Sequence, residues 1–272
     1  MFLLERSLCF LLRAKPDGNS AADETNLDLS EQSLTIRNPR VSTVDLSSKS
    51  SGSYFSPEFF KFLRGLARSN NRVWFRKNKQ RYERYVLAPS LRFIKDAGAE
   101  LRAVSPYLVA DPRPFGGSLF RIYRDIRFSK DKSPYKTNVA MEFWHRRGGK
   151  KSYTGLYLHL APGDSFAGAG IWHPDPPTLN RVRRAIVSRP EAWRRVKESG
   201  LKMEGESLKR PPAGFDRNHT FAEDLKLKDI TAGVRFSNAQ VTGPRFMKDF
   251  VQASKKLDPL NKFLAGALSL PW

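Results

Sequence analysis

Residues suited to binding metals or forming disulfides are scarce in this chain. It contains one cysteine, Cys9, and four histidines, which are His145, His159, His173 and His219. A single thiol excludes an internal disulfide and any cysteine-rich zinc centre, and the histidines lack the close spacing of metal ligands. We therefore expect neither a metal nor another cofactor.

Common phosphate-binding and nucleophile motifs are also missing. The sequence has no G-x-x-x-x-G-K-[ST] loop, no G-x-G-x-x-G that opens a helix after a strand, and no G-x-S-x-G elbow. Gly168-Ala-Gly170 is too short for a dinucleotide fingerprint and lacks its third glycine. Any phosphate site in this chain must therefore be built in another way.

No apolar stretch is long enough to span a bilayer. Residues 1–14 hold a short apolar run, which Glu5-Arg6 interrupts, so they form a poor signal peptide. An organelle-targeting segment and a wrongly assigned start codon are both compatible with this run, and otherwise we expect a cytoplasmic protein. Residues 15–53 contain no aromatic residue, so they cannot offset chain entropy by burial. We predict a disordered or targeting-like extension over 1–53 and a single domain over 54–272.

Acidic residues are few, at 27 against 48 lysines and arginines, and the net charge is +21. Residues 1–53 hold six basic and seven acidic residues, so the remaining 42 basic and 20 acidic residues give the folded part +22. Such a charge attracts nucleic acid, anionic membranes or acidic partners, at least non-specifically. A generic basic protein is the simpler alternative.

The spacing of hydrophobic residues predicts helices at both ends of a run of strands. Helices are predicted to begin near residues 57, 72, 179, 190, 219, 245 and 259, with Pro89 kinking or dividing the second. Strands are predicted at residues 119–128, 138–145, 153–160, 165–172 and 230–236. Short turns between neighbouring strands favour an antiparallel meander. The predicted fold is α+β, with four to five antiparallel strands covered by N- and C-terminal helices.

Residues 119–137 carry a dense group of cations within a predicted strand and loop. Strand period two places Arg124 on the apolar face, where it must find a carboxylate or backbone carbonyls. On the other face Asp125 lies beside Arg127, so it should be a strong acid that orients arginines. This cation density indicates an anion site. An ion-pair ladder on an exposed sheet face is the alternative.

The same stretch resembles a known family. The resemblance is carried by Arg121-Ile-Tyr-Arg-Asp-Ile-Arg-Phe128, then Asp131-Lys132 and Tyr135, and by the segments 55–59, 74–75, 155–160 and 208–216. These residues resemble the conserved hypothetical proteins of the domain of unknown function 2461 family over roughly residues 54–268. The resemblance implies membership and no catalytic residue, because no activity is assigned to that family. The first fifty residues look like an extension outside it.

The predicted meander allows a composite ligand site. Arg121, Arg127, Glu142, Tyr157 and His159 would surround a hollow over two glycines of the strand 165–172, and loop cations would close over a bound carboxylate or phosphate. The candidate site residues are Arg121, Arg124, Asp125, Arg127, Lys132, Tyr135, Lys136, Glu142, Tyr157, His159 and Trp172. A hydrogen-bonded core histidine at His159, and core packing of Trp172, are the plainer alternatives.

Three functions follow from this site. The first is a binding domain for an anionic small molecule or nucleic acid, whose binding weakens with salt. The second is an architectural motif in a protein-interaction domain, with every arginine paired. The third is an enzyme acting on a phosphorylated substrate, with Glu142 or His159 as acid–base group and arginines stabilising charge.

Overall fold

A computed structural model of the chain describes residues 52–148 and 154–272. The predicted N-terminal extension lies outside the described residues, apart from its last two positions. Within the described ranges, no helix is both long and apolar enough to cross a membrane.

The N-terminal helical region begins with α2 (Pro57–Arg68), where Ser56 is extended and Pro57 takes the first helical position. It continues through α3 (Arg72–Lys77), α4 (Lys79–Tyr82), a π-helical turn η1 (Glu83–Leu87) and α5 (Ala88–Leu101). The predicted second helix breaks at Asn78, whereas at Pro89 the chain passes from η1 into α5 without leaving helical geometry. Because Pro89 has no N–H, the α-helical ladder is interrupted there, and the Ala88 N–H donates to the Glu83 carbonyl five residues back.

Five antiparallel strands form one sheet in the order β1-β2-β3-β4-β5, so the predicted meander is confirmed. The strands are β1 (Leu108–Val109), β2 (Val139–His145), β3 (Gly155–Leu160), β4 (Ser165–Ile171) and β5 (Ile230–Phe236). The register aligns Glu142, Tyr157, Gly168 and Gly233 in one row across β2 to β5.

The strand predicted at 119–128 is wrong. Only isolated bridges occur there, between Leu119 and Met141 and between Tyr123 and Tyr135. Beyond Phe120 the chain folds back on itself instead of following β2, so no sheet face fixes the alternation of its side chains. Phe128 is 81% exposed. The edge strand is β1, which lies outside the predicted strands.

The C-terminal half supplies α6 (Pro176–Ser188), α7 (Pro190–Glu198), α8 (Ala222–Leu225), α9 (Asn238–Thr242) and α10 (Phe246–Ala267). Asp175 caps α6 by accepting from the Thr178 N–H. The two final helices predicted from the sequence are one helix, with Pro259 inside α10. Buried Leu257, Leu260 and Leu264 bracket that proline, and their packing offsets the lost backbone hydrogen bond.

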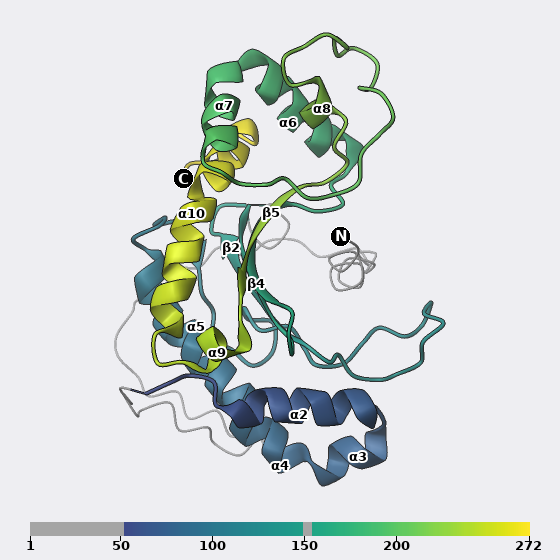
Figure 1. Cartoon of the computed structure of the whole chain (residues 1–272), viewed down its shortest axis with the longest axis vertical. Coiled ribbons are helices and arrows are strands. Elements are labelled where there is room, and N and C mark those ends of the chain that lie inside the picture. The colour runs from purple at the N-terminus through teal and green to yellow at the C-terminus, as the bar shows by residue number, and fades with distance from the viewer. Residues whose placement is uncertain (1–51, 149–153) are drawn as a thin grey trace, which may run out of the picture.

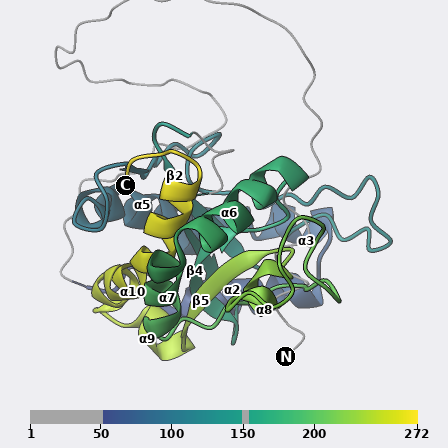
Figure 2. The ribbon, with the colours of Figure 1, turned by 90° about the horizontal axis from the view of Figure 1, so that it is seen from above.

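The helices α10 and α5 lie along one face of the sheet, while α6 to α8 and α2 to α4 lie beyond its two ends (Figures 1 and 2). No helix covers the opposite face in Figure 1 within the described ranges, and we call it the open face. Its sheet residues are Ala140, Glu142, Trp144, Gly155, Tyr157, His159, Phe166, Gly168, Gly170, Thr231, Gly233 and Arg235.

The last residues of the chain return to the end of β2. His145 Nε2 lies 2.6 Å from the Pro271 carbonyl oxygen, and its Nδ1 accepts from the Gly148 N–H at 3.3 Å. The imidazole therefore carries its proton on Nε2 and both nitrogens are satisfied. The Trp272 ring stacks on His145, and its indole N–H donates to Asp258 at 2.6 Å.

Candidate functional site

Residues 122–136 form a loop that is closed by its own backbone, and we call this segment the motif loop. The Lys136 N–H donates to the Ile122 carbonyl at 2.7 Å, and the Arg124 N–H donates to the Pro134 carbonyl at 3.0 Å. The loop projects from the body of the molecule beside the sheet (Figure 1). Its side chains divide into cations with partners inside the loop and cations without them.

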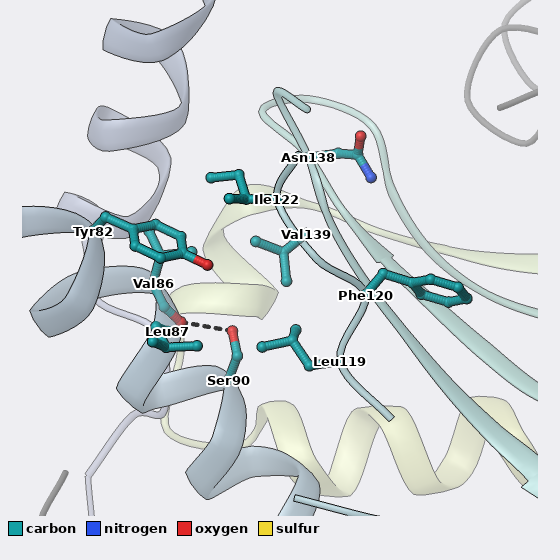
Figure 3. A pocket seen from close by; sticks show the side chains of 9 residues that line it. All are labelled: Tyr82, Val86, Leu87, Ser90, Leu119, Phe120, Ile122, Asn138 and Val139. Carbon is teal, nitrogen blue, oxygen red and sulfur yellow. Dashed lines mark hydrogen bonds between the residues drawn. The ribbon is translucent and has the colours of Figure 1, made fainter. Parts of the chain in front are cut away.

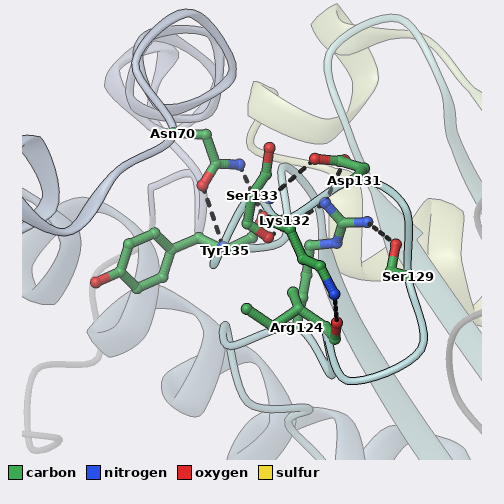
Figure 4. A network of polar contacts seen from close by, with 8 residues as sticks. Asn70, Arg124, Ser129, Asp131, Lys132, Ser133 and Tyr135 are labelled. Carbon is green, nitrogen blue, oxygen red and sulfur yellow. Dashed lines mark hydrogen bonds and ion pairs between the residues drawn. The ribbon is translucent and has the colours of Figure 1, made fainter.

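Arg124 is the best-enclosed cation of the motif loop, with 14% of its side chain exposed. It forms an ion pair with Asp131 and donates to the Ser133 carbonyl at 3.2 Å (Figure 4). Arg124 was expected to find a carboxylate or backbone carbonyls, and it contacts one of each. Hydrogen bonds from Ser133, and then the Arg124 guanidinium, lower the pKa of Asp131 to about 2. The pair holds the two arms of the loop together.

Arg127 is paired with its neighbour Asp125, with 2.6 Å between Nη2 and Oδ2. The Arg127 side chain and backbone N–H lower the pKa of Asp125 to about 2, with Arg121 a smaller cause. Asp125 is thus the strong acid that the sequence predicts. The Arg127 guanidinium, which is 66% exposed, is already occupied by a carboxylate.

Lys132 and Tyr135 hold the loop in shape. The Lys132 ammonium donates to the Ile126 carbonyl at 3.0 Å (Figure 4). The Tyr135 ring is buried and stacks on Phe75 with 4.2 Å between centroids. The Asn70 amide donates to the Tyr135 carbonyl at 2.8 Å and accepts from its N–H at 3.1 Å. These contacts fasten the base of the loop to the N-terminal helices.

Arg121 and Lys136 differ from the other motif cations, because neither has an ion-pair partner among the described residues. The Lys136 ammonium lies 5.4 Å from the centroid of the Phe120 ring, and the side chain is half-buried. Burial, and then the charge of Arg121, lower the pKa of Lys136 to about 8. The charges of Arg121 and Lys136 repel each other, and the Asp125 carboxylate, on which Arg121 also acts, is paired with Arg127. The two cations therefore form a site suited to an external anion.

This pair stands at the β2 edge of the open face. The Phe120 N–H donates to the Ala140 carbonyl at 3.0 Å, so the Phe120 segment runs beside β2. Phe120 and Asn138 point away from Leu119 and Val139, which face a small recess beside η1 (Figure 3). That recess has room for about one water molecule. The Phe120 ring meets Tyr157 edge-on at 6.3 Å.

Tyr157 lies in the cross-strand row between Glu142 and Gly168. Burial, and then the charge of Glu142, raise the pKa of Tyr157, so the phenol keeps its proton and can donate it in a hydrogen bond. A Cβ built on Gly168 would lie 3.6 Å from the Phe166 ring and 3.7 Å from the Ala232 carbonyl, which are ordinary van der Waals distances. Gly168 itself is buried.

His159 is 1% exposed, which favours the plainer expectation of a core histidine. Its Nδ1 lies 3.4 Å from the Tyr157 hydroxyl and 3.5 Å from the Asn138 amide, and its ring stacks on Phe166. Burial lowers the pKa of His159 to about 4. The imidazole is therefore neutral near pH 7, and it is enclosed by side chains of its own sheet face.

Two further expectations are corrected by the geometry. Gly170 does not leave a hollow: its φ is +125°, and a Cβ there would lie 2.1 Å from the Ile230 carbonyl oxygen, so the glycine permits a close approach of β5. Trp172 follows the end of β4 and stacks on His173 at 3.9 Å. Its ring belongs to that end of the strand, four positions beyond Gly168, and not to the row at Tyr157.

Sequence reasoning missed Phe120 and Asn138, which lie against Lys136 and His159. Their signal was present, because Phe120 follows the buried Leu119 and Asn138 precedes the buried Val139, so each alternates with a core residue at the β2 edge. For Phe120 it was read as part of one long strand. Among the described residues, no group of three His, Cys, Asp or Glu side chains could hold a metal ion.

The fold and site define an α+β protein with a five-stranded antiparallel meander and a self-closed basic loop at one sheet edge. Residues 58–263 match the family described as conserved hypothetical protein (DUF2461), which covers more than half of the chain. The chain therefore belongs to this family, as the resemblance of the central motif implied. No curated protein and no solved structure matches it.

Proposed function

We propose that this protein binds a small anionic compound, bearing a carboxylate or phosphate group, through Arg121 and Lys136 at the β2 edge of the open face. The supporting observation is the half-buried Lys136 ammonium, which lacks an acidic partner among the described residues. A buried charge without compensation is costly, and an anion bound from outside would supply that compensation.

The other motif residues have a different part in this proposal. The two arginines are already paired, Arg124 with Asp131 and Arg127 with Asp125. Lys132 donates to a backbone carbonyl, and the Tyr135 ring stacks on Phe75. They keep the architectural role that was one of the three hypotheses, and they hold Lys136 in position at the base of the loop. Tyr157 and Glu142 lie farther along the face and would contact the uncharged part of a ligand.

The test is a titration of the full chain by calorimetry with succinate, inorganic phosphate, ribose 5-phosphate and a short oligonucleotide. The variants are Arg121→Gln and Lys136→Met, with Arg127→Gln as the matched control. Loss of a charge-assisted hydrogen bond costs about 1.5–3 kcal/mol, so each site variant should weaken binding of the small anions by roughly 10- to 100-fold. The control should bind as the unmodified protein does.

Two outcomes contradict the proposal. One is that none of the small anions binds saturably. The other is that Arg127→Gln weakens binding as much as Lys136→Met does. A preference for the oligonucleotide, with affinity falling steeply as salt rises, would instead support the nucleic-acid alternative and overturn the small-molecule site.

A further inference from the structure

Lys136 combines three features that are rarely found together on a protein surface. Its side chain is half-buried, with the ammonium 5.4 Å from the centroid of the Phe120 ring. The charge of a second cation, Arg121, acts on it, and it forms no ion pair among the described residues. Lysines that are desolvated or placed next to another cation become nucleophiles, because more of the amine is unprotonated near neutral pH.

The surroundings suit carbonyl chemistry as well as anion binding. With a pKa of about 8, about a tenth of the Lys136 amine is unprotonated at pH 7, several hundred-fold more than for an ordinary lysine. Arg121 keeps its charge at this pH and can hold an anionic group. The protonated Tyr157 phenol, next to Phe120, can donate a hydrogen bond to an oxygen on the open face.

We propose that the ε-amine of Lys136 forms an imine with an aldehyde or ketone whose carboxylate or phosphate group is held by Arg121. This inference rests on the proposed function and names the ligand class of that site. The amine nitrogen attacks the carbonyl carbon, the carbonyl oxygen leaves as water with the two amine protons, and a C=N bond forms. The step uses no oxidant or reductant.

The experiment is reductive trapping on the full chain. The protein is incubated at pH 7 with glyoxylate, which has an aldehyde and a carboxylate, and with cyanoborohydride, which reduces the imine to a stable secondary amine. Peptide mapping by mass spectrometry then compares adduct formation at Lys136 and at Lys130, an exposed lysine of the same loop. Propionaldehyde, which has no anionic group, is the second probe.

Glyoxylate should label Lys136 about tenfold or more faster than Lys130. Arg121→Gln should slow glyoxylate labelling of Lys136 more than propionaldehyde labelling, because only glyoxylate has a carboxylate that Arg121 can bind. Equal labelling of Lys136 and Lys130 by glyoxylate in the unmodified protein would overturn the imine, and so would an equal loss with both probes in Arg121→Gln.

A Lys136→Arg variant separates this inference from the proposal that it rests on. Arginine keeps the positive charge but cannot form the imine, so the variant should still bind succinate while the adduct at position 136 disappears. If succinate binds in the calorimeter and Lys136 is not trapped preferentially, anion binding stands and the imine is rejected. If succinate does not bind, the anion site itself is rejected.

Discussion

At the scale of single residues, Lys136 gives the site a pH dependence. Its folded-state pKa of about 8 lies below the ordinary lysine value because of burial and then Arg121, so the ammonium is lost as the pH rises through 8. An anion bound beside it favours the charged form and raises that pKa again. Binding near pH 8 to 9 should therefore take up a proton.

The affinity for succinate, whose charge is constant in this range, should fall as the pH is raised from 7 to 9. In Lys136→Arg the fall should disappear, because arginine stays charged. Calorimetric titrations in two buffers of different ionisation enthalpy measure both the affinity and the proton uptake. An unmodified protein whose affinity is flat between pH 7 and 9 would remove Lys136 from the site.

His159 links the same face to folding stability. Burial lowers its folded-state pKa to about 4, against about 6.5 in the unfolded chain, so the unfolded state binds the proton first as the pH falls. Above pH 6.5 the imidazole is neutral in both states and does not lower the unfolding free energy. Between pH 6.5 and 4 the unfolding free energy falls progressively as the unfolded state takes up the proton.

Replacing His159 by phenylalanine removes this titration and keeps a ring against Phe166. Between pH 7 and 4.5 the unmodified protein should lose about 2–3 kcal/mol more unfolding free energy than His159→Phe does. Denaturant unfolding at the two pH values measures the difference, in which the carboxylates common to both proteins cancel. Parallel losses in the two proteins would show that His159 is not buried and neutral.

At the scale of elements, the sequence of the motif loop indicated some of its charge interactions but not the path of its backbone. The acidity of Asp125 followed from its spacing to Arg127. The expected partner of Arg124 followed from placing that residue on the apolar face of a strand, which the structure does not contain. The path of the chain did not follow from the sequence, because alternation of Phe120 and Ile122 with charged residues is the same for a strand and for a loop that folds back. Only the backbone partners, Pro134 and Ile122, decide between the two, and they are local contacts that the pattern does not encode.

The helices and the sheet were predicted better, since each has a buried face with a clear period. Among the helices one exception is α10, where a proline at position 259 suggested a boundary that packing overrides. At the site, the row of Glu142, Tyr157 and Gly168 follows from strand period and short turns. The absence of an acidic partner for Lys136 in the described residues depends on the loop path and was beyond the sequence.

The ion pair of Arg124 with Asp131 should control the order of the motif loop. In Asp131→Asn the half-exposed arms of the loop lose the carboxylate that joins them, so trypsin should cleave after Lys130 and Lys132 faster. Asp125→Asn is the matched control, because it breaks a pair between neighbours that does not join the arms. Limited proteolysis followed by mass spectrometry compares the variants, and equal cleavage in both would contradict this role of Asp131.

At the scale of the whole molecule, the C-terminal residues tie α10 to the far end of β2. His145 is fully buried, and its Nε2–H depends on the Pro271 carbonyl. Removing residues 271–272 leaves a buried donor without a partner, which costs about 1–3 kcal/mol of unfolding free energy. Trp272→Phe keeps that carbonyl and should lose less, and chemical denaturation ranks the two variants. A truncated chain as stable as the full one would show that this tie carries no weight.

The charge of the molecule has two components at this scale. Ion pairs on the surface, such as Arg235 with Asp164 at 2.8 Å, contribute little each and are screened by salt. The excess of positive charge over residues 54–272 gives a general attraction for anions, whereas Lys136 and Arg121 give a local one. Raising the salt concentration should therefore weaken oligonucleotide binding much more than succinate binding.

The amide of Lys136 is one of the two backbone donors that close the motif loop, and its side chain is the group on which the site depends. Lys136 therefore takes part in both loop closure and the proposed ligand site. In deuterium-exchange experiments, the rate at which this amide gains deuterium measures how often the loop opens, and a bound ligand that slows the exchange also shows that loop closure and ligand occupancy are energetically coupled.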